Sequence, residues 1–145
     1  DMKTNNSLVA YALLRVAMGV NMLGHGLARI PKLDAFSDNM VTNFQKSWLP
    51  SLSIKIFGLA LPFAEFLIGL LLIIGLFTYR TSVAGAILII LLLFGSSTIE
   101  NWEAMGIQMI YALFFYQLIT QINNNSYAAD HLFKNKIRQN ESNRI

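Results

Sequence analysis

Three ionisable side chains lie within long apolar stretches of this sequence, where charge is costly and therefore informative. Arg15 and His25 fall in the first stretch and Glu65 falls in the second. At 1.5 Å per helical residue, Arg15 lies about 12 Å and Glu65 about 18 Å below the same membrane face. An unpaired buried charge costs on the order of 3–5 kcal/mol, so we expect an Arg15–Glu65 ion pair. The pair either fixes helix register or forms the polar floor of a site.

His25 stands between Gly24 and Gly26, which leave room for a close approach. Its imidazole can donate to a quinone carbonyl or relay a proton, and the alternative is a structural hydrogen bond. Gln108 and Tyr111 share one helical face at a similar depth. The predicted ligand site therefore comprises His25, Arg15, Glu65, Gln108 and Tyr111, with no catalytic residue assigned. No His pair has metal-ligand spacing, so no metal site is expected.

Small residues mark a predicted seam between the first two apolar stretches. In the second stretch they flank Glu65 at helical spacings, and Pro62 frees the carbonyl of Gly58 by removing a backbone hydrogen bond. Small residues allow close helix packing in membranes, and packing alone is the alternative to a functional role. The seam comprises Gly19, Gly26, Gly58, Pro62 and Gly69.

Four apolar segments must position these residues. They cover about residues 7–30, 51–77, 82–99 and 102–122, and a membrane-spanning helix needs about 17–25 residues. Several runs are apolar on every face, which is typical of membrane spans rather than soluble helices. The prediction is an all-α integral membrane four-helix bundle, a single domain over residues 1–145, with a tight turn at 78–81.

The stretch from Pro31 to Pro50 differs from the spans. Apolar residues recur there at spacings of three and four with polar residues between them, at Leu33, Phe36, Met40, Phe44 and Trp48. This pattern predicts an amphipathic helix between the first two spans, lying in the membrane interface. A lid packed on the bundle is the alternative. Residues 133–145 form a polar, basic tail.

The composition agrees with a membrane protein: 54% of residues are hydrophobic, 13% are charged and none is Cys. The net charge is +3, and the basic residues gather in loops and at the chain end rather than in a patch with aromatic residues, which argues against nucleic-acid binding. The expected partners are the lipid bilayer and other membrane subunits or further copies of the chain. The distribution of Lys and Arg places both termini in the cytoplasm, across a bacterial-type inner membrane.

Several motifs together resemble the DoxX family. They are residues 13–19 (LLRVAMG), 23–29 (LGHGLAR), 63–69 (FAEFLIG), 75–81 (GLFTYRT) and, more loosely, 127–130 (YAAD). The resemblance implies a four-helix membrane protein related to a subunit of a thiosulfate:quinone oxidoreductase, and other members accompany thiol-redox proteins. Carried over, the family pattern falls on Arg15, Gly19, His25, Gly26, Glu65 and Gly69, with Arg29 as a basic residue after the His.

Three functions follow from these observations. The first is a DoxX-like membrane subunit of a quinone-linked redox system, in sulfur-compound or thiol oxidation, with a non-covalent quinone as its cofactor. The second is a non-catalytic accessory or assembly subunit of a larger membrane complex. The third is an oligomeric small-solute carrier. The sequence leaves open whether the chain is an enzyme at all.

Overall fold

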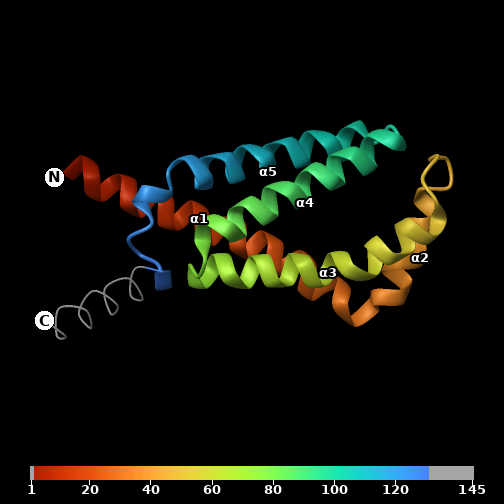
Figure 1. Cartoon of the computed structure of the whole chain (residues 1–145), viewed down its shortest axis with the longest axis horizontal. Coiled ribbons are helices and arrows are strands. Elements are labelled where there is room, and N and C mark those ends of the chain that lie inside the picture. The colour runs from red at the N-terminus through yellow and green to blue at the C-terminus, as the bar shows by residue number, and fades with distance from the viewer. Residues whose placement is uncertain (1, 131–145) are drawn as a thin grey trace, which may run out of the picture.

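A computed structural model describes residues 2–130, and every regular element in that range is a helix. In chain order these are α1 (Met2–Arg29), η1 (Ile30–Lys32), α2 (Leu33–Asn43), α3 (Ser51–Ile74), α4 (Thr78–Thr98), α5 (Trp102–Thr120) and η2 (Ile122–Asn124). Helices α1, α3, α4 and α5 are the long ones, and Figure 1 shows α2 at one end of the bundle that they form. The predicted all-α bundle with a short helix between its first two long helices is confirmed. The predicted tail over 133–145, together with His131, lies outside the described residues.

Three stretches of the described chain are long and apolar enough to cross a membrane. They are Asn5–Asn43, which contains most of α1, then Ser51–Ile74 and Thr78–Thr98, which are α3 and α4. The fourth predicted span, α5, is not among them, because Glu103, Gln108 and Gln117 lower its hydropathy. Its crossing stays a prediction, supported by its antiparallel pairing with α4, which has nearly the same length.

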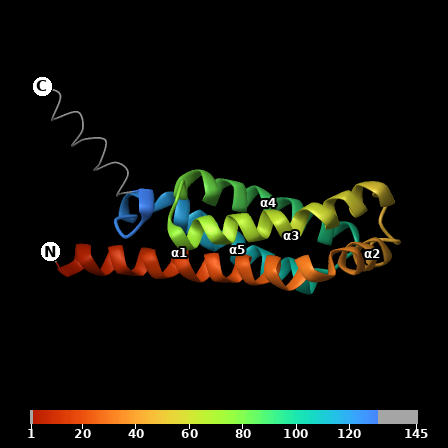
Figure 2. The ribbon, with the colours of Figure 1, turned by 90° about the horizontal axis from the view of Figure 1, so that it is seen from below.

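The second half of α1 runs antiparallel to α3 in close contact with it, and the start of α1 projects beyond the end of α3 (Figures 1 and 2). Glycine allows this approach: a Cβ added to Gly69 would lie 2.3 Å from the backbone nitrogen of Leu23. One added to Gly26 would lie 2.6 Å from the backbone nitrogen of Phe66. These contacts fix the register of the antiparallel pair, in which Leu23 is level with Gly69 and Gly26 is level with Phe66.

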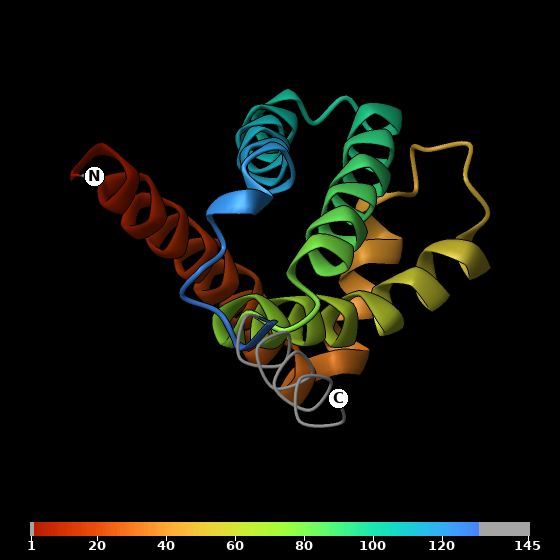
Figure 3. The ribbon, with the colours of Figure 1, turned by 60° about the vertical axis from the view of Figure 1, so that its left-hand side comes forward.

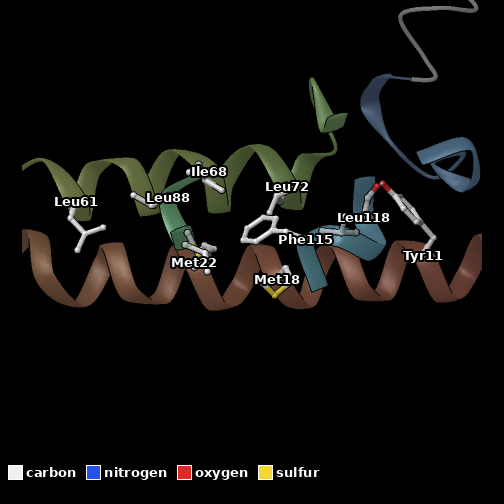
Figure 4. Close-up of a cluster of buried hydrophobic side chains, with 10 residues drawn as sticks. Tyr11, Met18, Met22, Leu61, Ile68, Leu72, Leu88, Phe115 and Leu118 are labelled. Carbon is white, nitrogen blue, oxygen red and sulfur yellow. The ribbon is translucent and has the colours of Figure 1, made fainter. Parts of the chain in front are cut away.

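Helices α4 and α5 form a second antiparallel pair that leaves α3 at an angle (Figures 1 and 3). The pair packs tightly where Gly85 faces Phe115, because a Cβ on Gly85 would lie 2.3 Å from that ring. Phe115 reaches from there into the core between the two pairs (Figure 4). The Tyr11 hydroxyl donates to the carbonyl of Leu118 at 2.9 Å, which ties α1 to α5. The core comprises Tyr11, Met18, Met22, Leu61, Ile68, Leu72, Leu88, Ile89, Phe115 and Leu118.

The turn between α3 and α4 lies earlier than predicted, because residues 78–81 form the first turn of α4. Helix α3 ends at Ile74, and Gly75 takes the left-handed conformation with φ 73°. The Asp130 carboxylate accepts hydrogen bonds from the backbone nitrogens of Phe77 at 2.7 Å and Thr78 at 2.8 Å. A carboxylate there satisfies N–H groups that the first turn of a helix leaves free, so α4 begins at Thr78.

Helix α2 ends at Asn43, so the predicted amphipathic helix is too long. Phe44 and Trp48 lie in the loop that follows, where the Ser47 hydroxyl donates to Thr98 Oγ1 at 2.9 Å. The ring of Trp48 meets Phe94 edge-on at 6.1 Å. These contacts hold the loop on the end of α4. Phe44 and Trp48 therefore do not continue the apolar face of α2 as predicted.

One face of α2 packs on the first turns of α3. Ser37 is fully buried there, and its hydroxyl donates to the carbonyl of Lys55 at 3.0 Å. A Cβ added to Gly58 would lie 3.1 Å from Ser37 Cα, so Gly58 serves this contact rather than the one between α1 and α3. Helix α2 therefore covers the end of the bundle.

Candidate functional site

A cleft of about 1350 Å³ lies at the end of the bundle that α2 covers, where the two helix pairs separate. Its walls come from the last turns of α1, from α2, from the first half of α3, from the end of α4 and from the start of α5. Apolar side chains form most of the lining, including Met22, Phe36, Phe57, Leu61 and Ile89. Ligand sites are typically concave and mostly apolar with a few placed polar groups, and this cleft has that character.

Four of the five predicted site residues line the cleft, and the fifth does not. His25 comes from α1, Glu65 from α3, and Gln108 and Tyr111 from α5. Arg15 lies elsewhere. The structure therefore brings together residues from helices far apart in the sequence.

Glu65 pairs with Arg29 rather than with Arg15. Arg29 Nη1 donates to both carboxylate oxygens of Glu65 at 2.7 Å, and the Glu65 side chain is only 4% exposed. The Arg29 guanidinium also lies over the Phe36 ring, 4.7 Å from its centroid. This interaction is favourable for a cation. The pair thus joins the end of α1 to the middle of α3, with α2 beside it, at one wall of the cleft.

The predicted Arg15–Glu65 ion pair is wrong because its assumed register is wrong. With Leu23 against Gly69 in the observed register, Glu65 lies about level with Leu27. Arg15 lies beyond the last turn of α3, more than 10 Å from the level of Glu65 at about 1.5 Å per residue. Arg29, almost four turns further along α1, is the basic residue at the right height.

Arg15 instead closes the opposite end of the bundle. Its guanidinium donates to the carbonyls of Leu72 and Ile73 near the end of α3, the latter at 3.1 Å. Its second terminal nitrogen donates to the carbonyl of Tyr127 at 2.6 Å. The last carbonyls of a helix lack partners within it, and a cation there is favourable. Arg15 is therefore a structural residue that holds residues near Tyr127 against α3.

His25 is half-buried in the cleft wall, and no side-chain hydrogen bond joins it to another of residues 2–130. Arg29 follows it by one helical turn, so the two side chains share a face of α1. Gly26 beside it takes the close contact with α3, while a Cβ on Gly24 would meet nothing within 4 Å. His25 thus offers a free imidazole to whatever occupies the cleft.

The α5 wall carries two polar side chains that reach toward α1 and α4. The Tyr111 hydroxyl donates to Asn21 Oδ1 at 3.4 Å, and Gln108 Nε2 donates to Ser96 Oγ at 3.0 Å. Gln108 Oε1 and Asn21 Nδ2 are buried without a hydrogen-bond partner. Asn21 was not among the predicted site residues, although it precedes His25 by four residues and shares its face in an apolar stretch.

The residues of the cleft can bind, orient and move a proton. The whole sequence lacks Cys, and residues 2–130 contain no group of His, Asp and Glu placed to hold a metal ion. The imidazole of His25 can accept or donate a proton, and Tyr111 and Gln108 can form hydrogen bonds.

Comparison with protein-family models gives a match to DoxX over residues 10–98, which is more than half of the chain. The matched range runs from the first third of α1 to the end of α4. It includes Arg15, His25, Arg29 and Glu65 and excludes the α5 wall of the cleft. No curated protein and no solved structure matches.

Proposed function

Because the chain belongs to the DoxX family of membrane proteins, we propose that it is a membrane subunit of a quinone-linked redox system whose cleft holds the quinone ring. The observation that supports this is one cleft combining apolar walls with His25, Gln108 and Tyr111. A quinone is a flat apolar ring with oxygens at opposite edges. The cleft offers hydrogen-bonding groups on two facing walls, from α1 and from α5.

In this proposal His25 exchanges a proton with a ring oxygen, as an imidazole does near neutral pH. The Arg29–Glu65 pair holds the α1 and α3 wall in place. Electrons come from a sulfur compound or thiol that a partner subunit oxidises. The chain itself binds and orients the quinone, which supplies the redox chemistry.

We further propose that the chain lies in a bacterial-type inner membrane with both termini in the cytoplasm. The start of α1 and the segment that follows η2 lie at the opposite end of the bundle from α2 (Figure 1), and α2 is part of the cleft wall. Under this orientation the cleft faces the non-cytoplasmic side, and Trp48 and Trp102 lie exposed at that same face. Exposed Trp is enriched at membrane interfaces.

Thermal unfolding in lipid nanodiscs tests the proposal. A short-chain benzoquinone is expected to raise the melting temperature of the wild type, because a ligand that binds the folded state stabilises it. His25→Ala should lose most of that increase. Gly24→Ala is the matched control, since its new methyl group meets nothing within 4 Å and should leave the increase intact. A wild-type melting temperature that saturating quinone does not change would refute quinone binding.

A non-catalytic accessory subunit is the second candidate, favoured by the self-contained Arg29–Glu65 pair, whose carboxylate already has both oxygens bound. In that case the polar groups serve packing, and the lipid-facing helices bind another subunit. Affinity purification of the intact membrane complex separates the two functions. A partner that co-purifies with wild-type and His25→Ala chains and keeps full activity with both would favour the accessory role.

A further inference from the structure

The Arg29 side chain leaves part of its hydrogen-bonding capacity unused. Its Nη1 atom alone donates to both carboxylate oxygens of Glu65, at 2.7 Å each. The Nη2 and Nε atoms make no hydrogen bond to another of residues 2–130. Both of these nitrogens carry N–H donors, and a bidentate pair between Arg and a carboxylate normally uses two nitrogens rather than one. The N–H groups on Nη2 and Nε are therefore available to a ligand.

These free N–H groups keep exposed surface at the cleft. Arg29 lines the cleft, and its side chain is 26% exposed. Among residues 2–130, the polar side-chain atoms that are buried without a partner belong to Arg15, Asn21, Ser82, Gln108 and Asn125. Arg29 is not among them, so its unpaired nitrogens are not sealed off. The Phe36 ring covers one face of the guanidinium and the Glu65 carboxylate holds Nη1, which fixes the group in place.

The charged residues of the cleft wall favour a negatively charged ligand. Among the described lining residues these are Arg29, Lys46 and Glu65, two cations and one carboxylate, so the lining has an excess of positive charge. Arg29 also lies within the apolar stretch Asn5–Asn43. Ionisable side chains in such stretches face the bundle interior or a cavity and mark the path of a substrate or ion. An anionic group in the cleft would meet the free side of this cation.

We infer that the free N–H groups of Arg29 form a subsite for an ionised oxygen, so that the cleft prefers a quinone whose ring carries an ionised hydroxyl group. The inference rests on the proposed quinone-binding function and names the class of quinone that the cleft selects. A hydrogen bond between a charged donor and an anionic oxygen is about twice as strong as one between neutral groups. His25 lies one turn before Arg29 on the same face of α1, so a ring held at Arg29 lies beside the imidazole.

The test compares two probes on the wild-type chain in nanodiscs of zwitterionic lipid. One is a naphthoquinone with a hydroxyl group on its quinone ring, which is ionised at neutral pH, and the other is the neutral methyl ether of that compound. The two share the ring and every oxygen, and the lipid has no net charge that would compete for Arg29. A hydrogen bond to a charged group corresponds to about tenfold or more in affinity. Calorimetric titration should therefore give the hydroxyquinone a dissociation constant about tenfold lower than that of the ether.

Two variants assign the preference to Arg29. Arg29→Met/Glu65→Leu removes the guanidinium without leaving the carboxylate unpaired, and it keeps the excess positive charge of the lining. Arg29→Lys keeps a cation beside Glu65 but loses the planar set of donors on several nitrogens, and it serves as the test if the double variant fails to fold. Both should reduce the preference to about threefold or less. Lys55→Met is the control, because it removes a cation that lies outside the cleft, and it should keep the wild-type preference.

The outcomes separate the inference from the proposed function. Equal affinity of the two probes for the wild type overturns the subsite while quinone binding stands. A preference that survives in the folded Arg29 variants also overturns it, and so does its loss in a folded Lys55→Met chain, which would trace the preference to the overall charge. If the short-chain benzoquinone binds and neither probe does, the subsite is overturned and the proposed function stands. If none of the three compounds binds, the proposed function fails and the inference fails with it.

Discussion

Substituting Gly69 tests the close crossing of α1 and α3, on which the position of the cleft depends. An added Cβ would lie 2.3 Å from the backbone nitrogen of Leu23, and 2.7 Å from its Cα and from the carbonyl oxygen of Gly19. These atoms are backbone, so no side chain can rotate away to make room. Ordinary contact for a Cβ begins near 3.4 Å, so Gly69→Ala requires the two helices to separate by about 1 Å.

The expected loss follows from two opposing terms. Overpacking of a close contact costs about 1–3 kcal/mol, while Gly→Ala inside a helix gains up to about 1 kcal/mol. We therefore expect Gly69→Ala to lose about 1–2 kcal/mol of unfolding free energy. Gly24→Ala, in α1, makes the same substitution without the clash, since nothing lies within 4 Å of the added Cβ. It should be neutral or slightly stabilising.

Reversible unfolding by SDS in mixed micelles, followed by circular dichroism, measures both variants under one protocol. Gly69→Ala should unfold at a lower SDS fraction than the wild type, and Gly24→Ala at the same or a higher one. Comparable stabilities for the two variants would refute the crossing described here, because its geometry makes one site closed and the other open.

Other predictions concern the two arginines and Asp130. Removing one partner of a buried ion pair costs about 3–5 kcal/mol, and we expect the lower end for Glu65→Gln in the same SDS assay because the Arg29 side chain is 26% exposed. The double variant Arg29→Met/Glu65→Leu should recover most of that loss; a double variant as unstable as the single one would contradict it. Asp130→Asn weakens the cap of α4 by about 0.5–2 kcal/mol, so hydrogen exchange should quicken at the two capped amides, and unchanged exchange there would count against the cap. Arg15→Met should lower stability but keep the quinone-dependent rise in melting temperature, because Arg15 does not line the cleft; loss of that rise in a folded variant would place Arg15 in the site.

Hydropathy and residue type were enough to predict the helices, because a membrane-spanning helix must satisfy its own backbone and must be apolar over its length. They also drew attention to His25, Glu65, Gln108 and Tyr111. The partner of Glu65 could not be found in this way. Pairing depends on the register of α1 against α3, and the backbone contacts at Gly69 and Gly26 set that register.

The turn between α3 and α4 shows a second limit. Its local sequence, with Thr78 and Arg80, has the polarity of a loop. Yet α4 begins at Thr78 because Asp130, some fifty residues later, supplies the cap. No local pattern contains that partner. The start of α4 was therefore not predictable from the residues around it.

The two arginines of α1 explain why the cleft opens at one end of the bundle. Arg15 binds the end of α3 and the chain near Tyr127, and Asp130 in that same segment caps α4, so the helix pairs are held together there. At the other end Arg29 is paired to Glu65 and covered by Phe36, which joins α1 and α3 to α2 but leaves α4 and α5 free of this cluster. The pairs separate at that end, and polar side chains from α1 and α5 face the space between them. A ligand in contact with both walls would add to the Tyr111–Asn21 and Ser47–Thr98 hydrogen bonds, which join the two pairs nearer that end.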